Sequence, residues 1–306
     1  PRLARISFCE CCAMTASPLL TAFLPVALGI IMFGLGLSLT LADFARVVKY
    51  PKPVLIGLVC QIVLLPFICF LIANGFGLAP ALAVGLMLLA ASPGGTTANL
   101  FSHLAHGDVA LNITLTAVNS LIAILTMPLL VNLSLAYFME ADQAIPLQFA
   151  KVLQVFAIVL VPVTLGMLVR RLTPAFAARM EKPMKLVAAL FLAGTVILAL
   201  VKDWQTVVEY APLVGAAALL FNLLSLTLGY WVPRVLKIPK RQAIAIGMEI
   251  GIHNGTLAIA LALSPTLLNN STMAIPAALY SLIMFFTAAG FGWWVSRSPA
   301  RAVVLD

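Results

Sequence analysis

The chain has 306 residues, of which 63% are apolar and 9% are charged, and its formal net charge is +8. Soluble domains contain about 45–50% apolar and about 25% charged residues, so this composition excludes a soluble globular protein and a disordered chain. The apolar residues form continuous runs instead of alternating with polar ones, which disfavours a β-barrel. The sequence therefore predicts an all-α polytopic membrane protein.

Nine apolar stretches are predicted to cross the membrane. A spanning helix needs about 20 mostly apolar residues. In chain order the stretches are residues 21–41, 54–74, 81–104, 109–137, 148–169, 184–201, 211–232, 242–263 and 271–295. Residues 1–20 are predicted to be a tail of uncertain origin, residues 21–295 a transmembrane domain, and residues 296–306 a cytoplasmic C-terminal tail.

Most of the 18 basic residues follow the first, fifth, seventh and ninth stretches, so they gather on one side of the predicted membrane. Cytoplasmic loops are enriched in Lys and Arg, which predicts a cytoplasmic C-terminus and an outside N-terminus in an inner or plasma membrane. This bias also accounts for the net positive charge. No nucleic-acid partner is therefore expected, and membrane lipid is the expected partner of the apolar helices.

Two of the predicted spans are interrupted by residues that break helices. The third reads ASPGGTTAN over residues 91–99, and the eighth reads EIGIHNGT over residues 249–256. Pairing spans one to four with spans six to nine aligns these interruptions, and the odd offset means that paired spans run in opposite senses. This pattern predicts an inverted repeat, and in secondary transporters such a pair of interrupted segments marks the binding site.

Glu249 is the only carboxylate well inside a predicted span. A charge near the bilayer centre costs about 2.5–3.5 kcal/mol on insertion scales, so Glu249 must face a cation, a hydrogen-bond partner or water. We interpret it as an ion ligand or a proton carrier. The alternative is a protonated or hydrogen-bonded structural carboxylate.

Several amide and hydroxyl side chains accompany Glu249 in the predicted spans. Asn99 and Asn254 each follow an interruption, Asn112, Thr116 and Asn119 share one face of the fourth span, and Gln61 lies in the second. Their oxygens can coordinate a cation or hydrogen-bond a substrate. The alternative is that these side chains join neighbouring helices.

The residues alone indicate a cation-coupled transporter of a small anionic solute. Oxygen ligands favour Na⁺ over a soft transition metal. The helices that begin after the two interruptions would present positive partial charge to an anion. His253 has two interpretations, a packed neutral side chain and a titrating or ligating group. The Met and Phe side chains are interpreted as lipid-facing and core residues.

Four segments resemble the bile acid:sodium symporter family. They are GIIMFGLGL at 29–37 followed by Asp43 and Phe44, SPGGTTAN at 92–99, HGDVAL at 106–111 and EIGIHNG at 249–255. The resemblance covers about residues 25–295. It implies alternating access between a core domain of about residues 54–137 and 211–295 and a panel domain of about residues 21–41 and 148–201. The two broken spans would cross in the core.

The resemblance also implies two sodium sites. The first would use Asn99, Asn112, Thr116 and Glu249; the second would use Gln61, Glu249, the backbone of Ile250 and Ile252, and His253. Ala98 and Asn112 stand where serines are common in the family. His253 stands where a glutamine is usual, which leaves room for a proton at the second site.

The substrate implied by the resemblance is a small organic anion. Its site would be lined by Thr96, Thr97, Asn99 and Asn254. In the last span, Met284 and Phe285 stand where some relatives carry a His-Asn pair associated with bile-acid binding. A smaller anion, such as a keto acid or a pantoate-like acid, is therefore the expected substrate.

The sequence thus predicts a sodium-coupled symporter of a small organic anion, with co-transported sodium, no organic cofactor and no enzymatic activity. A proton-coupled carrier or an exporter of the same fold is the alternative. A remote alternative is an intramembrane hydrolase that pairs Ser92 or Ser102 with His103 or His253, for which no motif is present.

Overall fold

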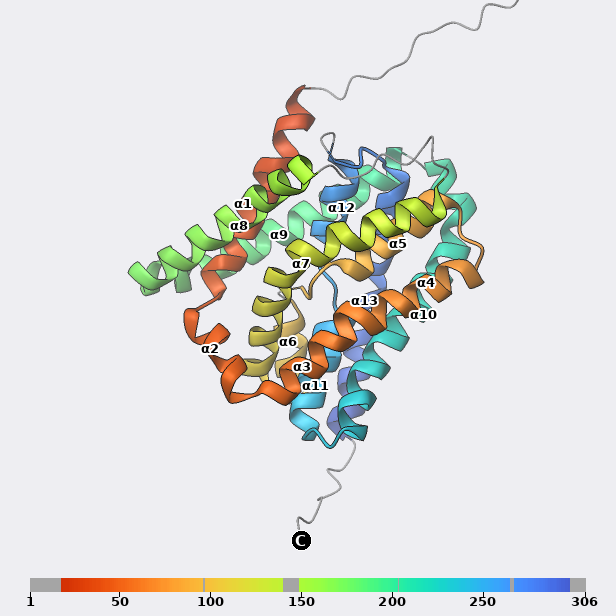
Figure 1. The fold of residues 1–306 in the computed structure, drawn as a ribbon. Coiled ribbons are helices and arrows are strands. Elements are labelled where there is room, and N and C mark those ends of the chain that lie inside the picture. The colour runs from red at the N-terminus through yellow and green to blue at the C-terminus, as the bar shows by residue number, and fades with distance from the viewer. Residues whose placement is uncertain (1–17, 96, 140–148, 203, 265–266, 298–306) are drawn as a thin grey trace, which may run out of the picture.

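The computed structural model describes residues 18–95, 97–139, 149–202, 204–264 and 267–297, and within these ranges the chain is helical with no strand. The elements, drawn in Figure 1, are α1 (Pro18–Ser38), α2 (Leu41–Lys49), α3 (Pro51–Val59), η1 (Cys60–Leu64), α4 (Leu65–Gly75), α5 (Pro80–Ala91), α6 (Thr97–Leu104), α7 (Val109–Phe138), α8 (Phe149–Leu172), α9 (Pro174–Lys202), α10 (Trp204–Val235), α11 (Lys240–Gly251), α12 (Gly255–Leu263), η2 (Thr272–Ala274) and α13 (Ile275–Arg297). The predicted all-α class is confirmed for these residues.

Several helices are long and apolar enough to cross a membrane. Among the described residues, four satisfy both conditions: Pro51–Gly75, Val109–Phe138, Val208–Val235 and Thr272–Arg297. A fifth is added if Gly29–Ser38 and Leu41–Lys49, which are bent by 57°, form one span. These helices confirm a multi-pass membrane protein. The full set of nine crossings stays a prediction.

The bend between α1 and α2 is held by a side-chain cap. The Asp43 carboxylate accepts hydrogen bonds from the Thr40 backbone N–H at 2.7 Å and from the Thr40 hydroxyl at 2.6 Å. Arg46 adds an ion pair to the same carboxylate. A capped start favours a new helix over continuation of the old one. The helix expected over residues 21–41 therefore ends at Ser38, and α2 begins at Leu41.

A π-turn, η1, lies inside the helix that runs from Pro51 to Gly75. The Leu65 backbone N–H donates to the Cys60 carbonyl, five residues earlier. Pro66 follows and has no N–H, so the regular ladder loses a donor at this turn. Such turns insert one extra residue into a helix and are frequent at functional sites. Gln61 lies within this turn and is buried.

Both interruptions predicted from the sequence break their helices. Helix α5 ends at Ala91 and Ser92 is extended, with ψ 145°, because a residue that precedes proline is pushed away from helical geometry. Helix α11 ends at Gly251. Helix α12 then begins with Asn254 as its N-cap, whose side-chain oxygen accepts from the Leu257 N–H at 3.0 Å.

The interrupted helices occupy the interior of the protein. Residues 82–91 of α5, 243–251 of α11 and 255–262 of α12 are all buried. Helices α7, α10 and α13 pack around them, whereas α1 crosses α8 and α9 at one side of the molecule (Figure 1). A Cβ atom on Gly36 or Gly166 would collide with backbone atoms of the facing helix, so glycine permits the close α1–α8 crossing.

Candidate functional site

The two helix breaks lie against each other and are joined by backbone hydrogen bonds. The Gly95 N–H donates to the Ile252 carbonyl at 2.7 Å, and the Asn254 N–H donates to the Pro93 carbonyl at 2.9 Å. Gly94 and His253, which lie between these bonds, pair as an antiparallel bridge. Each break therefore satisfies part of the unwound backbone of the other, because buried unpaired N–H and C=O groups are costly.

Glu249 projects from the last turn of α11 to this junction. Its side chain is buried, with 1% of the residue exposed. The Thr116 hydroxyl of α7 lies 2.6 Å from Oε2, whereas Oε1 has no hydrogen-bond partner among the described residues. A Cβ atom on Gly94 would collide with the carboxylate. The lack of a side chain at Gly94 thus lets the first break lie directly against Glu249.

The polar face predicted for the fourth span is directed into the protein. Asn112, Thr116 and Asn119 of α7 are all buried. The Asn112 Nδ2 donates to the Ala245 carbonyl of α11 at 2.7 Å, which leaves Oδ1 without a partner in the described part of the chain. Asn112 therefore both joins α7 to α11 and presents an unused oxygen one helical turn from Thr116.

Gln61 and His253 meet at one backbone carbonyl. The Gln61 Nε2 lies 2.9 Å from the Ser92 oxygen, and the His253 Nδ1 lies 3.2 Å from the same atom. Because a carbonyl only accepts, Nδ1 carries the proton in this contact and Nε2 of a neutral imidazole keeps a lone pair. Neither Gln61 Oε1 nor His253 Nε2 has a partner among the residues described.

The His253 ring is enclosed by aromatic side chains. Phe221 of α10 stacks on it with ring centroids 5.6 Å apart and an interplanar angle of 20°. Tyr280 of α13 approaches edge-on at 5.4 Å. These contacts hold the imidazole in one orientation, so that Nδ1 faces the Ser92 carbonyl.

The residues after the first break begin helix α6. Asn99 lies in the first turn of α6, and its Oδ1 is buried with no partner within the described ranges. Thr97 begins α6 and is half-buried. Thr96 lies outside the described residues.

The two backbone ligands predicted for the second sodium ion lie at the end of α11. The Ile252 carbonyl already accepts the Gly95 hydrogen bond, and Ile250 is buried in the last turn of α11.

Among the predicted sodium ligands, these contacts join Asn112, Thr116 and Glu249 in one group and bring Gln61 and His253 together around Ser92 in another. Four of their side-chain oxygens are buried without a described hydrogen-bond partner: Gln61 Oε1, Asn99 Oδ1, Asn112 Oδ1 and Glu249 Oε1. Leaving such an atom unsatisfied costs about 1–3 kcal/mol, and more for a charged group. Oxygen-rich donor sets fit a hard cation. No three His, Cys, Asp or Glu side chains in the described ranges gather to hold a metal ion.

The contacts of Ser92 do not fit a nucleophile. Its hydroxyl donates to the Leu89 carbonyl at 2.7 Å, and only its backbone oxygen meets His253. Ser102 is buried without a described partner for its hydroxyl, and the adjacent His103 is exposed. The hydrogen bonds of the described residues thus pair neither serine hydroxyl with a histidine.

A second buried hydrogen-bond network was not predicted from the sequence. The Gly251 carbonyl, at the end of α11, accepts from Asn222 Nδ2 at 2.8 Å and from the Tyr280 hydroxyl at 2.9 Å. The Thr287 hydroxyl donates to Asn222 Oδ1. The last carbonyls of a helix have no partner inside the helix, so these side chains secure the end of α11 beside the break. A lone Asn in the seventh predicted span was the available signal.

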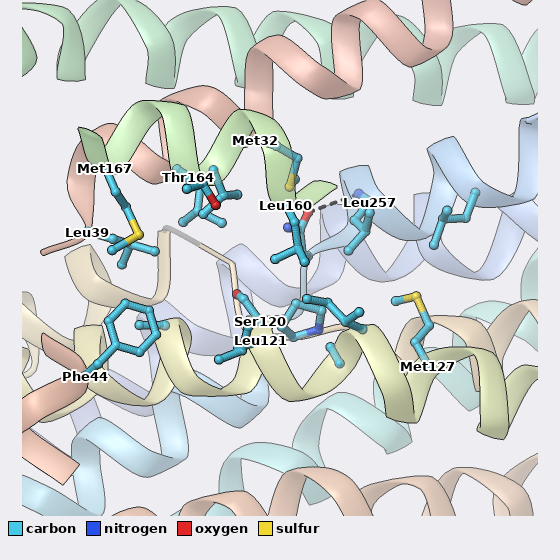
Figure 2. Close-up of a pocket in the computed structure, with 18 of the residues that line it drawn as sticks. Met32, Leu39, Phe44, Ser120, Leu121, Met127, Leu160, Thr164, Met167 and Leu257 are labelled. Atoms are coloured by element: carbon cyan, nitrogen blue, oxygen red, sulfur yellow. Dashed lines mark hydrogen bonds between the residues drawn. The ribbon is translucent and has the colours of Figure 1, made fainter. Parts of the chain in front are cut away.

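A cavity of about 120 Å³ lies beside the breaks. In Figure 2, Leu160, Thr164 and Met167 of α8 face Ser120, Leu121 and Met127 of α7 across it. Pro93 and Asn254 line it at the breaks. Of the predicted substrate residues that the structure describes, only Asn254 belongs to this lining; Thr97 and Asn99 do not. Met and Phe side chains assigned to core or lipid contact, such as Met32 and Phe44, also border it.

Comparison with known proteins gives a family model that matches this chain. Residues 25–210 match the model described as the sodium bile acid symporter family. The matched range contains the first break, the α7 side chains Asn112 and Thr116, most of α1 and all of α8.

Relatives from bacteria, plants and mammals match most of the chain. An uncharacterized sodium-dependent transporter of Bacillus subtilis, YocS, is 30% identical over 86% of this chain and 79% of its own length. A probable chloroplastic sodium/metabolite cotransporter of rice, BASS2, is 30% identical over 92% of this chain, which spans 66% of the rice protein. The rabbit ileal sodium/bile acid cotransporter is 25% identical over 79% of this chain and 69% of its own length.

Proposed function

Because the chain belongs to the sodium bile acid symporter family, we propose that it is a sodium-coupled symporter of a small organic anion that works by alternating access. Sodium-dependent transport is the property that this membership and the names of its relatives support. The anionic substrate and the alternating-access mechanism go beyond that support and are part of the proposal. The observation that carries the proposal is the set of buried oxygens without described partners where the two helix breaks meet.

The first sodium ion would bind between α6, α7 and α11. Asn99, Asn112, Thr116 and Glu249 would supply its oxygens. The second would bind between η1 and the end of α11, with Gln61, Glu249, the carbonyls of Ile250 and Ile252, and His253 around it. Sodium would thereby replace the missing hydrogen bonds of these atoms and offset the Glu249 charge.

The coupling follows from the charges that move together. Two sodium ions and a monoanion would carry one net positive charge inward. With a membrane potential of 100 mV, inside negative, the inward movement of this charge releases about 2.3 kcal/mol per cycle. The substrate would meet the breaks at Thr96, Thr97, Asn99 and Asn254. The positive end of α12 would attract its carboxylate.

The proposed moving parts follow the grouping of helices. Residues 21–295 would form the transmembrane domain with nine crossings, flanked by the tails 1–20 and 296–306. Residues 54–137 and 211–295 would form a core of inverted repeats, and residues 21–41 and 148–201 a panel. The close crossing of α1 on α8 supports a panel that moves as a unit. The cell membrane, with the C-terminus in the cytoplasm, is the proposed location.

A proton-coupled carrier of the same fold is the second candidate. It is favoured by one observation, the lone pair of His253 Nε2 at the second site. Transport that responds to a pH gradient and not to sodium would support it. No contact among the described residues supports the hydrolase alternative.

The thermal stability of the purified protein tests the sodium sites. A ligand that binds only the folded state raises the unfolding temperature by mass action. We expect sodium, but not potassium or choline, to stabilise the wild type. Glu249→Gln should lose this response, whereas Glu209→Gln, which changes an exposed carboxylate, should keep it. Equal stability in the three salts at hundreds of millimolar would refute the sodium sites.

A further inference from the structure

Helix α2 is too short to cross a membrane. It has nine residues, which at 1.5 Å per residue give about 14 Å of helix, whereas the apolar core of a bilayer is about 30 Å thick. Helix α1 has 21 residues, which is enough for a complete span. The 57° bend after Ser38 turns α2 away from the direction of α1. Helix α2 is therefore a connection between α1 and the span Pro51–Gly75, at the outer edge of the molecule in Figure 1.

One side of α2 packs on the protein. Phe44 and Val47 are half-buried on this side, and Val47 packs against the small apolar cluster that contains Leu111 of α7. Asp43, the only acidic residue of α2, is buried and forms an ion pair with Arg46. The negative charge of α2 is thus neutralised within the helix.

The opposite side of α2 carries an apolar stripe that the described part of the chain leaves uncovered. Leu41, Ala45 and Val48 are four and three residues apart, so they share one face of the helix. All three are exposed, Leu41 by 63% and Val48 by 85%. The next span also exposes apolar side chains, at Leu55 and Val59. We therefore expect the stripe to meet the same surroundings as the outer face of that span, which is lipid.

Basic side chains border this stripe. Arg46 and Lys49 are three residues apart on one flank of α2, and Lys52 is the second residue of α3. Lys49 and Lys52 are exposed, and neither has an ion pair among the described residues. Lys49 Nζ lies 5.5 Å from the centroid of the Tyr50 ring. Both lysines thus lie where the span Pro51–Gly75 begins, at the level of the lipid headgroups.

An apolar stripe beside a basic flank is typical of a helix that lies in the interface of a membrane. The apolar side chains of such a helix enter the boundary of the acyl chains, and its basic side chains attract anionic lipids. Long lysine side chains can keep their stems in apolar surroundings while the ammonium group reaches the headgroups. The two lysines without an ion pair therefore favour a negatively charged headgroup over a zwitterionic one.

We propose that α2 is an interfacial helix that binds anionic phospholipid. Leu41, Ala45 and Val48 insert among the acyl chains, and the ammonium groups of Lys49 and Lys52 hold the phosphodiester headgroup. Bound lipid fixes the depth of the connection between α1 and α3. This lipid site is independent of the ion that the protein carries, so it does not rest on the proposed sodium transport.

Native mass spectrometry of the purified full-length chain tests the selectivity for headgroups. The protein in mild detergent is offered equal amounts of phosphatidylglycerol and phosphatidylcholine with identical acyl chains. We expect about tenfold more bound phosphatidylglycerol, because each basic side chain near an anionic lipid contributes several-fold. sn-Glycerol 3-phosphate, which has the phosphate without acyl chains, should not displace the lipid. Equal binding of the two phospholipids, or displacement by glycerol phosphate, would overturn the proposal.

Variants with matched charge assign the selectivity to α2. Lys49→Gln with Lys52→Gln should reduce the preference to about twofold or less, whereas Lys49→Arg with Lys52→Arg should keep it. Arg171→Gln with Arg179→Gln is the control, because it removes two exposed positive charges from α8 and α9. It should keep the wild-type preference. An unchanged preference in the glutamine pair at α2, or an equal loss in the control pair, would contradict a site at α2.

Photocrosslinking identifies what covers the apolar stripe. The full chain with p-benzoylphenylalanine in place of Val48 is reconstituted in vesicles of equal parts phosphatidylglycerol and phosphatidylcholine and irradiated. We expect a covalent phospholipid adduct, read by mass. A covalent dimer would show that a second copy of the chain covers the stripe, and the lipid proposal would then be wrong. Irradiation without a phospholipid adduct would exclude insertion of the stripe into the membrane.

Discussion

The Thr116 hydroxyl and the Glu249 carboxylate form a buried contact of 2.6 Å between α7 and α11. This contact joins residues 133 positions apart in the chain. It connects the polar face of the fourth predicted span to the second helix break. Because Oε2 is engaged in this way, the carboxylate is held with Oε1 free for another ligand.

Replacing Thr116 should weaken sodium binding without removing the fold. Thr116→Val keeps the shape and loses the hydroxyl, so we expect the sodium concentration for half-maximal stabilisation to rise by about tenfold or more, the scale of a hydrogen bond to a charged group. Thr116→Ser retains the hydroxyl and should remain near wild type. A sodium titration followed by thermal unfolding measures both. Equal behaviour of the two variants would contradict a ligand role for the hydroxyl.

A methyl group at Gly94 should disrupt the sodium site directly. The added Cβ would collide with both oxygens of Glu249 and push the first break away from α11. Overpacking of this kind costs about 1–3 kcal/mol. We expect Gly94→Ala to lose the sodium response. Gly290→Ala is the control, because a Cβ there meets no atom within 4 Å. The same thermal titration distinguishes the two.

Asn222 and Tyr280 should stabilise the end of α11 cooperatively. Either donor alone still satisfies the Gly251 carbonyl, so Tyr280→Phe is expected to lower the free energy of unfolding by about 1 kcal/mol. Combining it with Asn222→Leu leaves the buried carbonyl without a donor. The loss in the double variant should exceed the sum of the single losses by about 1 kcal/mol.

Denaturation in detergent measures this coupling as a double-mutant cycle. Ser281→Ala serves as a control, because the Ser281 hydroxyl bonds only to the Ala277 carbonyl of its own helix in the described contacts. Strict additivity of Tyr280→Phe and Asn222→Leu would show that the two side chains act independently on α11.

Glutamine should replace His253 more readily than an apolar residue. A glutamine amide can donate to the Ser92 carbonyl and supply an oxygen where His253 has Nε2. We expect His253→Gln to keep the sodium response within about threefold of wild type, and His253→Leu to raise the half-saturating sodium concentration by about tenfold. Radioactive sodium binding to purified protein measures both values. A response retained in His253→Leu would exclude this side chain from the site.

Local chemistry made the helix breaks predictable. Proline with adjacent glycines at residues 93–95, and glycines at 251 and 255 around polar side chains, interrupt helices through rules that need no tertiary information. The buried positions of Glu249 and the α7 face were likewise expected, because polar groups inside a membrane span must face protein or water. Their assignment as sodium ligands remains a prediction.

Other features depend on contacts between distant segments. The double capping of Gly251 requires α10 and α13 to approach α11 at one level, which no single span indicates. The π-turn at Gln61 falls inside one long apolar helix, whose hydropathy does not mark it. The cavity is lined mostly by ordinary apolar residues, so only the position of α1 and α8 opposite α7 across it distinguishes them from lipid-facing ones.

Coupled flux in proteoliposomes tests the central claim most directly. Entry of radioactive sodium is measured with and without a panel of external monocarboxylates, for wild type, Glu249→Gln and the exposed-carboxylate control Glu209→Gln. Sodium-coupled symport predicts that an anion stimulates sodium entry in wild type and in Glu209→Gln but not in Glu249→Gln. Anion uptake that proceeds at the same rate without sodium, and draws no sodium with it, would contradict the account.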